Sequence, residues 1–109
     1  PKIMAMMNKY KVEGYGRFWL VLEMMRTQAN YKIDDKHYNW LALAQRMLCT
    51  VNEAKEFVGD CVEVYELFIK DENGFIYSAS LQERMIHLDN VRAQRVRAGQ
   101  MRHEKEWKD

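Results

Sequence analysis

The sequence has few of the residues that mark secreted, metal-binding or membrane proteins. Its two cysteines, Cys49 and Cys61, lie far apart along the chain and form no Cys-x-x-Cys pair. This usage is typical of a reduced cytosolic protein, and two cysteines alone cannot supply the four ligands of a structural zinc site. No apolar run approaches the roughly 20 residues of a membrane-spanning helix, and no signal-peptide pattern opens the chain. We therefore expect a cytoplasmic protein with no metal site and no membrane contact.

Catalytic patterns are equally scarce. The three histidines, His37, His87 and His103, are scattered, and neither cysteine has a histidine at ligand spacing. The chain contains no glycine-rich phosphate loop, no H-E-x-x-H sequence and no nucleophile elbow. The sequence thus predicts no enzyme activity, no catalytic residues, no cofactor and no small-molecule substrate.

Charge is nearly balanced in total but unevenly distributed. The net charge is +1, yet residues 1–50 carry eight basic and four acidic side chains, residues 51–79 carry two and seven, and residues 80–109 carry seven and five. Apolar residues make up 48% of the chain and charged residues 30%, which is typical of a folded domain. At 109 residues the chain is long enough for one such domain.

Apolar residues recur at the three- and four-residue spacing of helices in four segments. These segments are residues 2–11, 15–29, 36–48 and a fourth that begins at Val51. The glycines of "VEGYG" are expected to separate the first two helices. The residues expected to face the core are Tyr15, Phe18, Trp19, Leu22 and Met25 in the second helix, His37, Trp40, Leu41, Ala44, Met47 and Leu48 in the third, and Ala54, Phe57, Val58, Cys61, Val62 and Tyr65 in the fourth.

Capping residues separate the third and fourth helices. Thr50 and Glu53 have the T-x-x-E spacing of a capping box, in which each side chain accepts a hydrogen bond from the other residue's backbone N–H. Asp34 or Asp35 is expected to cap the third helix. Two helices joined by a short turn, the second of them well capped, are typical of a helix-turn-helix.

A β-hairpin is predicted after the fourth helix. The segment "LFIKDENGFIYS" places a polar loop between two apolar runs, and Asn73-Gly74 suits the positive φ angles of a tight turn. Tyr31 and Ile33 predict a short strand that would join the hairpin as a three-stranded sheet. A last helix begins near Ser80, and its apolar stripe thins after Val91. This order predicts a mostly α fold with a small sheet, in the α+β class, of the winged helix-turn-helix type.

The expected domain organisation follows from this pattern. Residues 1–91 are predicted to form the winged-helix domain. Residues 92–109 are basic, and we expect them to be the frayed or disordered start of a linker to a C-terminal region that this chain lacks.

The opening of the chain resembles a known family. "PKIMAMMNKYKVEGYGRFWLVLEMM" is similar to the start of phage replisome-organiser N-terminal domains, which are related to DnaD-like primosomal proteins. The shared features are Lys2-Ile3, the Glu-Gly-Tyr-Gly element at 13–16, Phe18-Trp19 and Leu22-Glu23. "CVEVYELF" resembles the end of the family's fourth helix, and "RAQRVRAGQMR" its arginine-rich approach to a linker. The resemblance implies a winged-helix domain of a phage, plasmid or transposon replication protein.

The predicted fourth helix lies where a helix-turn-helix has its DNA-reading helix, yet its outward positions are acidic. They are Glu53, Glu56, Asp60 and Glu63. Carboxylates oppose binding to phosphates and to the acceptor-rich base edges. Asn52 and Lys55 are the only candidates on this helix for contacts to bases. We therefore expect a solvated face or a binding surface for a protein partner rather than base readout.

DNA contacts are expected at basic residues elsewhere in the chain. The candidates are Lys2, Lys9, Lys11 and Arg17 near the N-terminus and Arg92, Arg95, Arg97 and Arg102 near the C-terminus. The aromatic residues that would suit base stacking are instead expected in the core because of their helical spacing.

Three functions are suggested by these patterns. The first is a replication-initiation module of a phage or other mobile element that binds DNA chiefly through phosphates. The second is a protein-interaction or self-association scaffold in which this chain binds no DNA. The third, a winged-helix transcriptional regulator, is disfavoured by the acidic helix. DNA and replication proteins, or a second copy of the chain, are the expected partners.

Overall fold

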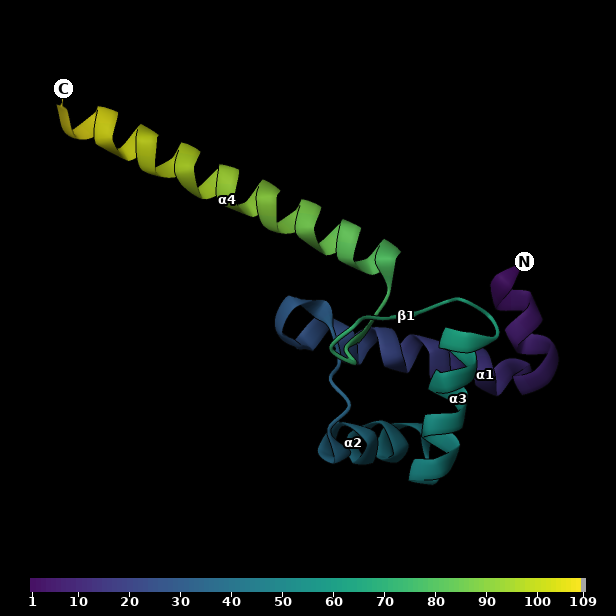
Figure 1. The fold of residues 1–109 in the computed structure, drawn as a ribbon. Helices are drawn as coiled ribbons and strands as arrows, with labels where there is room; N and C mark the ends of the chain where they lie inside the picture. Colours follow the sequence, from purple (N-terminus) through teal and green to yellow (C-terminus); the bar gives the residue numbers. More distant parts are fainter. Residues whose placement is uncertain (109) are drawn as a thin grey trace.

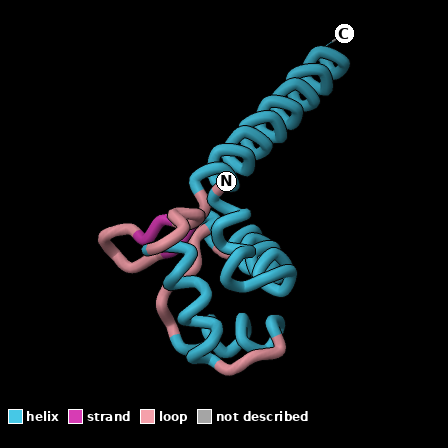
Figure 2. Tube along the Cα trace, turned by 90° about the vertical axis from the view of Figure 1, so that its right-hand side faces the viewer, coloured by secondary structure: helices cyan, strands magenta, loops and turns pink. Residues whose placement is uncertain are grey.

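The computed structural model describes residues 1–108, with side chains through Arg102. The chain is mostly helical and contains one antiparallel hairpin (Figures 1 and 2), so the α+β class is confirmed. The elements are α1 (Lys2–Thr27), a 3-10 turn (Ala29–Tyr31), α2 (His37–Met47), α3 (Val51–Glu63), β1 (Ile69–Lys70), β2 (Ile76–Tyr77) and α4 (Ala79–Lys108). No helix among the described residues has both the length and the hydropathy of a bilayer span.

The first two predicted helices form one kinked helix, α1. The kink lies at Lys11, where φ is 64° and ψ is −158°, whereas we expected a break at the glycines. Gly14 lies inside the helix and is buried. A Cβ atom at this position would lie 2.5 Å from Tyr10 Cβ and 2.7 Å from Met6 Sδ. Gly14 therefore allows the segment before the kink to pack closely against the rest of α1.

The core lies between α1, α2, α3 and the hairpin. Its largest fully buried side chains include Phe57, Phe68 and Met25, and the rings of Phe18 and Phe68 stack with centroids 5.4 Å apart. Deletion of any such buried apolar side chain costs several kcal/mol because it leaves a cavity.

Several expected core residues lie at the surface. Tyr15 and Trp19 are 41% and 46% exposed, because the face of α1 that meets the core carries Phe18, Val21 and Met25. In α2 the buried stripe is rotated from the expected one. It consists of Trp40, Leu43, Ala44 and Met47, which leaves His37 and Leu41 exposed. Leu48 is 91% exposed, because the left-handed backbone at this helix cap turns it away from α2.

The predicted capping box at the start of α3 is confirmed. The Glu53 backbone N–H donates to Thr50 Oγ1, and the Thr50 backbone N–H donates to Glu53 Oε1, both at 3.1 Å. The expected cap of α2 is wrong in detail, since Lys36 is the cap residue and its side chain makes no cap bond. Asp34 and Asp35 act instead on side chains of α2. Asp34 accepts a bond from the Asn39 amide, and Asp35 accepts one from Trp40 Nε1 at 2.7 Å.

The hairpin pairs Ile69 with Tyr77 and Lys70 with Ile76. Within its turn, Gly74 takes the positive φ angle, at 83°. Ile33 exchanges two backbone hydrogen bonds with Ile76, at 2.9 and 2.8 Å. This contact is an isolated bridge, so the sheet has two strands rather than the three expected. The segment before Ile33 cannot extend the pairing because it is wound into the 3-10 turn.

The last helix, α4, extends far from the body of the molecule (Figure 1). Ser78 caps it by accepting a bond from the Leu81 backbone N–H at 3.3 Å. Leu81 and Met85 are buried against the body. The helix then continues to Lys108, where we expected fraying after Val91. Its outer part is rich in Ala, Arg, Gln, Glu and Lys, which favour helix without any packing. The domain boundary at Val91 stays a prediction.

Candidate nucleic-acid interface

The acidic residues of α3 face basic residues of α1. Asp60 accepts hydrogen bonds from Lys9 Nζ, at 2.8 Å, and from the Tyr10 hydroxyl. Lys9 Nζ also lies 3.7 Å from Glu56 Oε1. Two of the carboxylates predicted to oppose DNA, Glu56 and Asp60, thus pair with Lys9 of α1. Of the four predicted protein-interaction carboxylates, Asp60 is occupied in this way, while Glu53, Glu56 and Glu63 remain exposed.

The pKa shifts at this contact report the same pairing. The Lys9 hydrogen bond, followed by that of Tyr10, lowers the pKa of Asp60. The bond to Asp60 raises the pKa of Lys9. Burial, followed by the bond to Asp60, raises the pKa of the Tyr10 hydroxyl. At neutral pH this site therefore holds a charged carboxylate, a charged ammonium and a neutral phenol.

The other predicted N-terminal DNA contacts are also drawn into local interactions. Lys2 Nζ lies 4.0 Å from Glu66 Oε2, and Lys11 Nζ donates to the Asn8 carbonyl at 2.9 Å. Arg17 is half-buried, close enough to Glu53 to lower the pKa of that carboxyl after the larger effect of the Thr50 hydrogen bonds. The structure therefore does not gather these four residues into one open basic patch.

The outer side of α3 offers a balanced surface. Asn52 and Lys55 are exposed, and Lys55 Nζ lies 5.9 Å from the centre of the Trp40 ring. A hollow of about 270 Å³ beside them is lined by two lysines, Lys55 and Lys70, and two carboxylates, Asp35 and Glu63. Opposite charges in equal number give this hollow no preference for phosphate.

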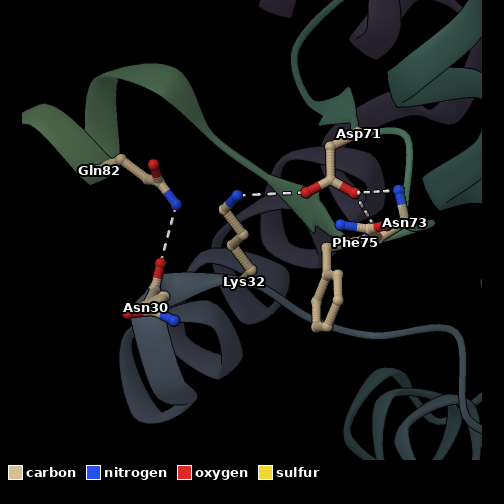
Figure 3. Close-up of polar contacts among 6 residues, drawn as sticks. All are labelled: Asn30, Lys32, Asp71, Asn73, Phe75 and Gln82. Atoms are coloured by element: carbon tan, nitrogen blue, oxygen red, sulfur yellow. Dashed lines mark hydrogen bonds and ion pairs between the residues drawn. The ribbon is translucent and has the colours of Figure 1, made fainter.

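The hairpin loop is organised around Asp71 (Figure 3). Its carboxylate accepts bonds from the backbone N–H groups of Asn73 and Phe75, at 2.9 and 3.0 Å, and from Lys32 Nζ at 3.2 Å. Partial desolvation alone would raise the pKa of Asp71, but the Phe75 and Lys32 contacts lower it overall. Asp71 thus uses its charge for the structure of the loop, and residues 71–75 include no basic side chain.

The exposed positive charge gathers along α4. Between residues 84 and 102 the helix carries five arginines and one aspartate, and all five arginines are exposed. Arg84, Arg95 and Arg102 are spaced by nearly whole numbers of helical turns, so they share one face of α4, with Arg92 beside it. Arg97 lies on the opposite face. We call the set of Arg84, Arg92, Arg95 and Arg102 the arginine face.

Two hollows connect the arginine face to α1. The first, of about 510 Å³, lies between α1 and α4 and is lined by Trp19, Leu22, Arg26, Arg84 and Leu88, among others. The second, of about 470 Å³, is lined by Glu23, Arg26, Thr27, Met85 and Arg92. Arg26 borders both. Arg92 also lies 3.9 Å from Asp89 and forms an exposed ion pair with it within α4. Exposed ion pairs of this kind contribute little to stability.

The sequence model of the family described as Lin1244/Lin1753-like, N-terminal, matches residues 1–81. The chain belongs to this family. No curated protein and no solved structure matches it. The family match covers α1 through the hairpin and the first residues of α4.

Several residues of this Lin1244/Lin1753-like domain were missed as site candidates. Arg26 and Arg84 line the hollow between α1 and α4, and Tyr15 and Trp19 lie on the surface near it. The sequence did contain a sign that this surface is exposed. One stripe of the helix consists of Tyr15, Trp19, Leu22 and Arg26, and an arginine at the end of an aromatic stripe indicates that the stripe reaches water.

The structure brings no group of three or more potential metal ligands together among the described residues of the Lin1244/Lin1753-like domain. Cys49 and Cys61 are both free thiols. Burial raises the pKa of the Cys61 thiol to about 12, so this thiol is neutral at physiological pH and packs as an apolar side chain.

Proposed function

We propose that this domain binds DNA chiefly through phosphate contacts of the arginine face on α4, as part of a replication-initiation complex of a phage or other mobile element. The observation that carries the proposal is the set of four exposed arginines on one side of a projecting helix. Arg84 and Arg102 are about 27 Å apart at the rise of an α-helix. Such a length spans several phosphates of a DNA strand.

In this proposal DNA lies along α4 and not against α3, which is where a helix-turn-helix has its DNA-reading helix. The order of α2, α3 and the hairpin, with Ile33 bridged to Ile76, supports placing the domain among winged helices. The exposed carboxylates Glu53, Glu56 and Glu63 on α3 argue against base readout by this helix and against a role as a sequence-reading transcriptional regulator. Of the predicted contacts, we retain Arg92, Arg95 and Arg102 as the main ones.

The replication role is supported by sequence resemblance. The opening of α1, with the Glu-Gly-Tyr-Gly element at 13–16, and the segment "CVEVYELF" are similar to phage replisome organisers. A module that holds DNA without reading its sequence fits the assembly of an initiation complex, where other components supply the sequence recognition.

The test is binding of a fluorescent DNA duplex, followed by anisotropy over a range of salt concentrations. Each phosphate contact contributes about 0.9 to the slope of log affinity against log salt. The double variant Arg95→Gln/Arg102→Gln should therefore bind more weakly and lower the slope by about 1.8. Arg46→Gln, at an exposed arginine on α2, is the matched control and should leave the slope unchanged. A wild-type protein that binds no duplex even at low salt would exclude the proposal.

A second candidate function is protein association, and a different surface favours it. Tyr38, Leu41 and Leu48 are 60%, 50% and 91% exposed. Tyr38 and Leu41 lie three residues apart on the outer side of α2, and Leu48 follows at its cap. Contiguous exposed apolar residues are typical of protein–protein contacts. If this face joins two copies of the chain, Leu41→Gln/Leu48→Gln should lower the sedimentation coefficient to that of a monomer.

A further inference from the structure

The surface of α1 that faces the start of α4 combines aromatic rings with an arginine. Tyr15, Trp19, Leu22 and Arg26 follow one another at intervals of four, three and four residues, so they form a single stripe along the helix. Tyr15 and Trp19 are 41% and 46% exposed. Large aromatic side chains that stay half-exposed on a folded domain often mark a binding surface.

Trp19 is held in place without being covered. Its indole contacts the ring of Tyr15 at a centroid distance of 6.2 Å and that of Phe18 at 6.0 Å. Both contacts are close to perpendicular, at 79° and 74°, and Trp19 is in no parallel stack with another ring of residues 1–102. Edge-to-face packing fixes the orientation of the ring while leaving part of its surface exposed for a flat ligand.

The groove beside Trp19 has apolar walls and a basic rim. Its volume is about 510 Å³, and Phe18, Leu22, Met85 and Leu88 contribute the apolar lining. Arg26 and Arg84 contribute positive charge, against the single carboxylate of Glu23. The neighbouring hollow adds Arg92, so three arginines and one glutamate surround the path from Trp19 to the outer part of α4. This charge is complementary to an anionic chain that also carries apolar, planar groups.

We propose that this groove binds a single strand of DNA, with a base stacked on Trp19 and the adjoining phosphates held by Arg26 and Arg84. A single strand presents base faces and phosphates together, and an aromatic ring within a basic groove is the usual means of binding it. In a duplex the bases are stacked on one another and cannot reach Trp19. This inference rests on the proposed DNA binding and adds to it a site for the unpaired strand.

The groove is continuous with the arginine face of α4. Arg84 belongs both to the groove and to the stripe that continues through Arg95 to Arg102. A strand bound at Trp19 can therefore continue along α4, where Arg92, Arg95 and Arg102 are exposed. The duplex and the single strand share the arginine face, whereas Trp19 and Arg26 of the groove serve the single strand alone.

The experiment compares two substitutions of Trp19 in the full chain. Trp19→Phe keeps an aromatic ring, and Trp19→Leu keeps an apolar side chain of similar role in packing but has no ring. The probe is a fluorescent oligothymidylate of roughly 15 nucleotides, a length chosen to exceed a site of several bases. We expect Trp19→Leu to weaken binding of this strand about tenfold, and Trp19→Phe to weaken it much less. Neither should change the affinity for a duplex.

Salt dependence separates the stacking contact from the phosphate contacts. Trp19→Leu removes no charge, so the slope of log affinity against log salt should stay as in the wild type. Arg26→Gln, at a groove residue outside the arginine face, should lower the slope for the single strand by about 0.7 and leave the slope for the duplex unchanged. It also tests the groove independently if Trp19→Leu folds poorly by circular dichroism. Val64→Ala, at an exposed apolar residue at the end of α3, should leave the binding of both DNA forms unchanged.

The possible failures are distinguishable. Equal binding of the oligothymidylate by the wild type, Trp19→Leu and Trp19→Phe would overturn the groove site, while the proposed function would stand if the Arg95→Gln/Arg102→Gln variant still lost duplex affinity. Equal losses for the single strand and the duplex in Trp19→Leu would also overturn it. Tighter binding of the corresponding oligouridylate would overturn the assignment to DNA. A wild-type protein that binds neither the single strand nor the duplex would exclude the proposed function itself.

Discussion

Gly14 and Gly16 lie two positions apart in α1 but have different surroundings. A Cβ atom on Gly14 would meet Tyr10 and Met6 at less than 3 Å, whereas one on Gly16 would meet nothing within 4 Å. We expect Gly14→Ala to lower the free energy of unfolding by about 1–3 kcal/mol through overpacking. Gly16→Ala should raise it by up to about 1 kcal/mol, because alanine is the better helix former. Urea denaturation of both variants measures the difference.

The pair of glycine variants also tests the kink at Lys11. If the segment before the kink does not pack on Gly14, the two alanine substitutions should have the same sign, because both then act only through helix propensity. Opposite signs would support the close packing of residues 2–10 against the rest of α1.

Asp60 makes the stability of the domain depend on pH in the acid range. Its hydrogen bonds from Lys9 and Tyr10 lower its pKa in the folded state. The contribution of Asp60 is therefore present above the usual aspartate pKa of about 3.9 and is lost as the pH falls through the lower value of the folded state. We expect Asp60→Asn to cost about 1 kcal/mol at pH 7, a modest figure because Lys9 is half-exposed.

The measurement is the unfolding free energy of the wild type and Asp60→Asn between pH 3 and pH 7. The difference in unfolding free energy between the two proteins should become smaller below about pH 4. Glu72→Gln, at an exposed position of the hairpin loop, serves as the control for removal of a carboxylate. A gap that is constant over the whole range would show that the ionised form of Asp60 contributes nothing specific.

At the scale of elements, α3 depends on the capping box at its start. Thr50→Ala removes the acceptor for the Glu53 backbone N–H, and such a loss costs about 0.5–2 kcal/mol. Thr50→Ser keeps a hydroxyl in place and should remain close to the wild type. Thermal unfolding of the two variants, followed by circular dichroism, measures the effect. A Thr50→Ser variant as unstable as Thr50→Ala would show that the methyl group, rather than the hydrogen bond, stabilises this turn.

The existence of helices was easier to predict than their rotation or their breaks. The capping box and the bounds of α2 followed from local patterns, since residues three and four apart interact directly. The kink was placed at the glycines because glycine usually breaks a helix, but Gly14 is required by packing and the chain bends at Lys11. Leu41 and Leu48 were expected inside because apolar spacing on a short helix fits two neighbouring faces, and only the position of α1 and α3 selects one.

At the scale of the whole molecule, α4 determines the shape. The Cα radius of gyration is 18.5 Å, and the molecule is 65 Å long, whereas a compact chain of this length would have a radius of about 13 Å. Small-angle X-ray scattering should give a radius of gyration near 18 Å and a maximum dimension above 60 Å. A radius near that of a compact domain would mean that α4 folds back on the body and that the arginine face is not free.

The candidate site combines contacts that the sequence showed with contacts that it did not. Arg92, Arg95 and Arg102 could be chosen as candidates for phosphate contact from the sequence alone, because they stand in an arginine-rich segment with little acidic charge. Lys2 and Lys9 were equally basic, but they pair with Glu66 and Asp60 more than fifty residues away. Arg26 and Arg84 do not stand out in the sequence, and their proximity depends on where α4 begins relative to α1.

The sequence by itself determined the helices, the capped turn, the hairpin and the separation of charge into an acidic centre and basic ends, because each depends on neighbours within a few residues. Only the tertiary structure decided that Asp60 of the acidic helix pairs with Lys9 of α1, that Trp19 lies at the surface, and that Arg26 and Arg84 line the hollow beside it. The reason is physical. Burial and long-range ion pairs depend on which faces of the helices meet, and the packing of the whole core selects those faces at once.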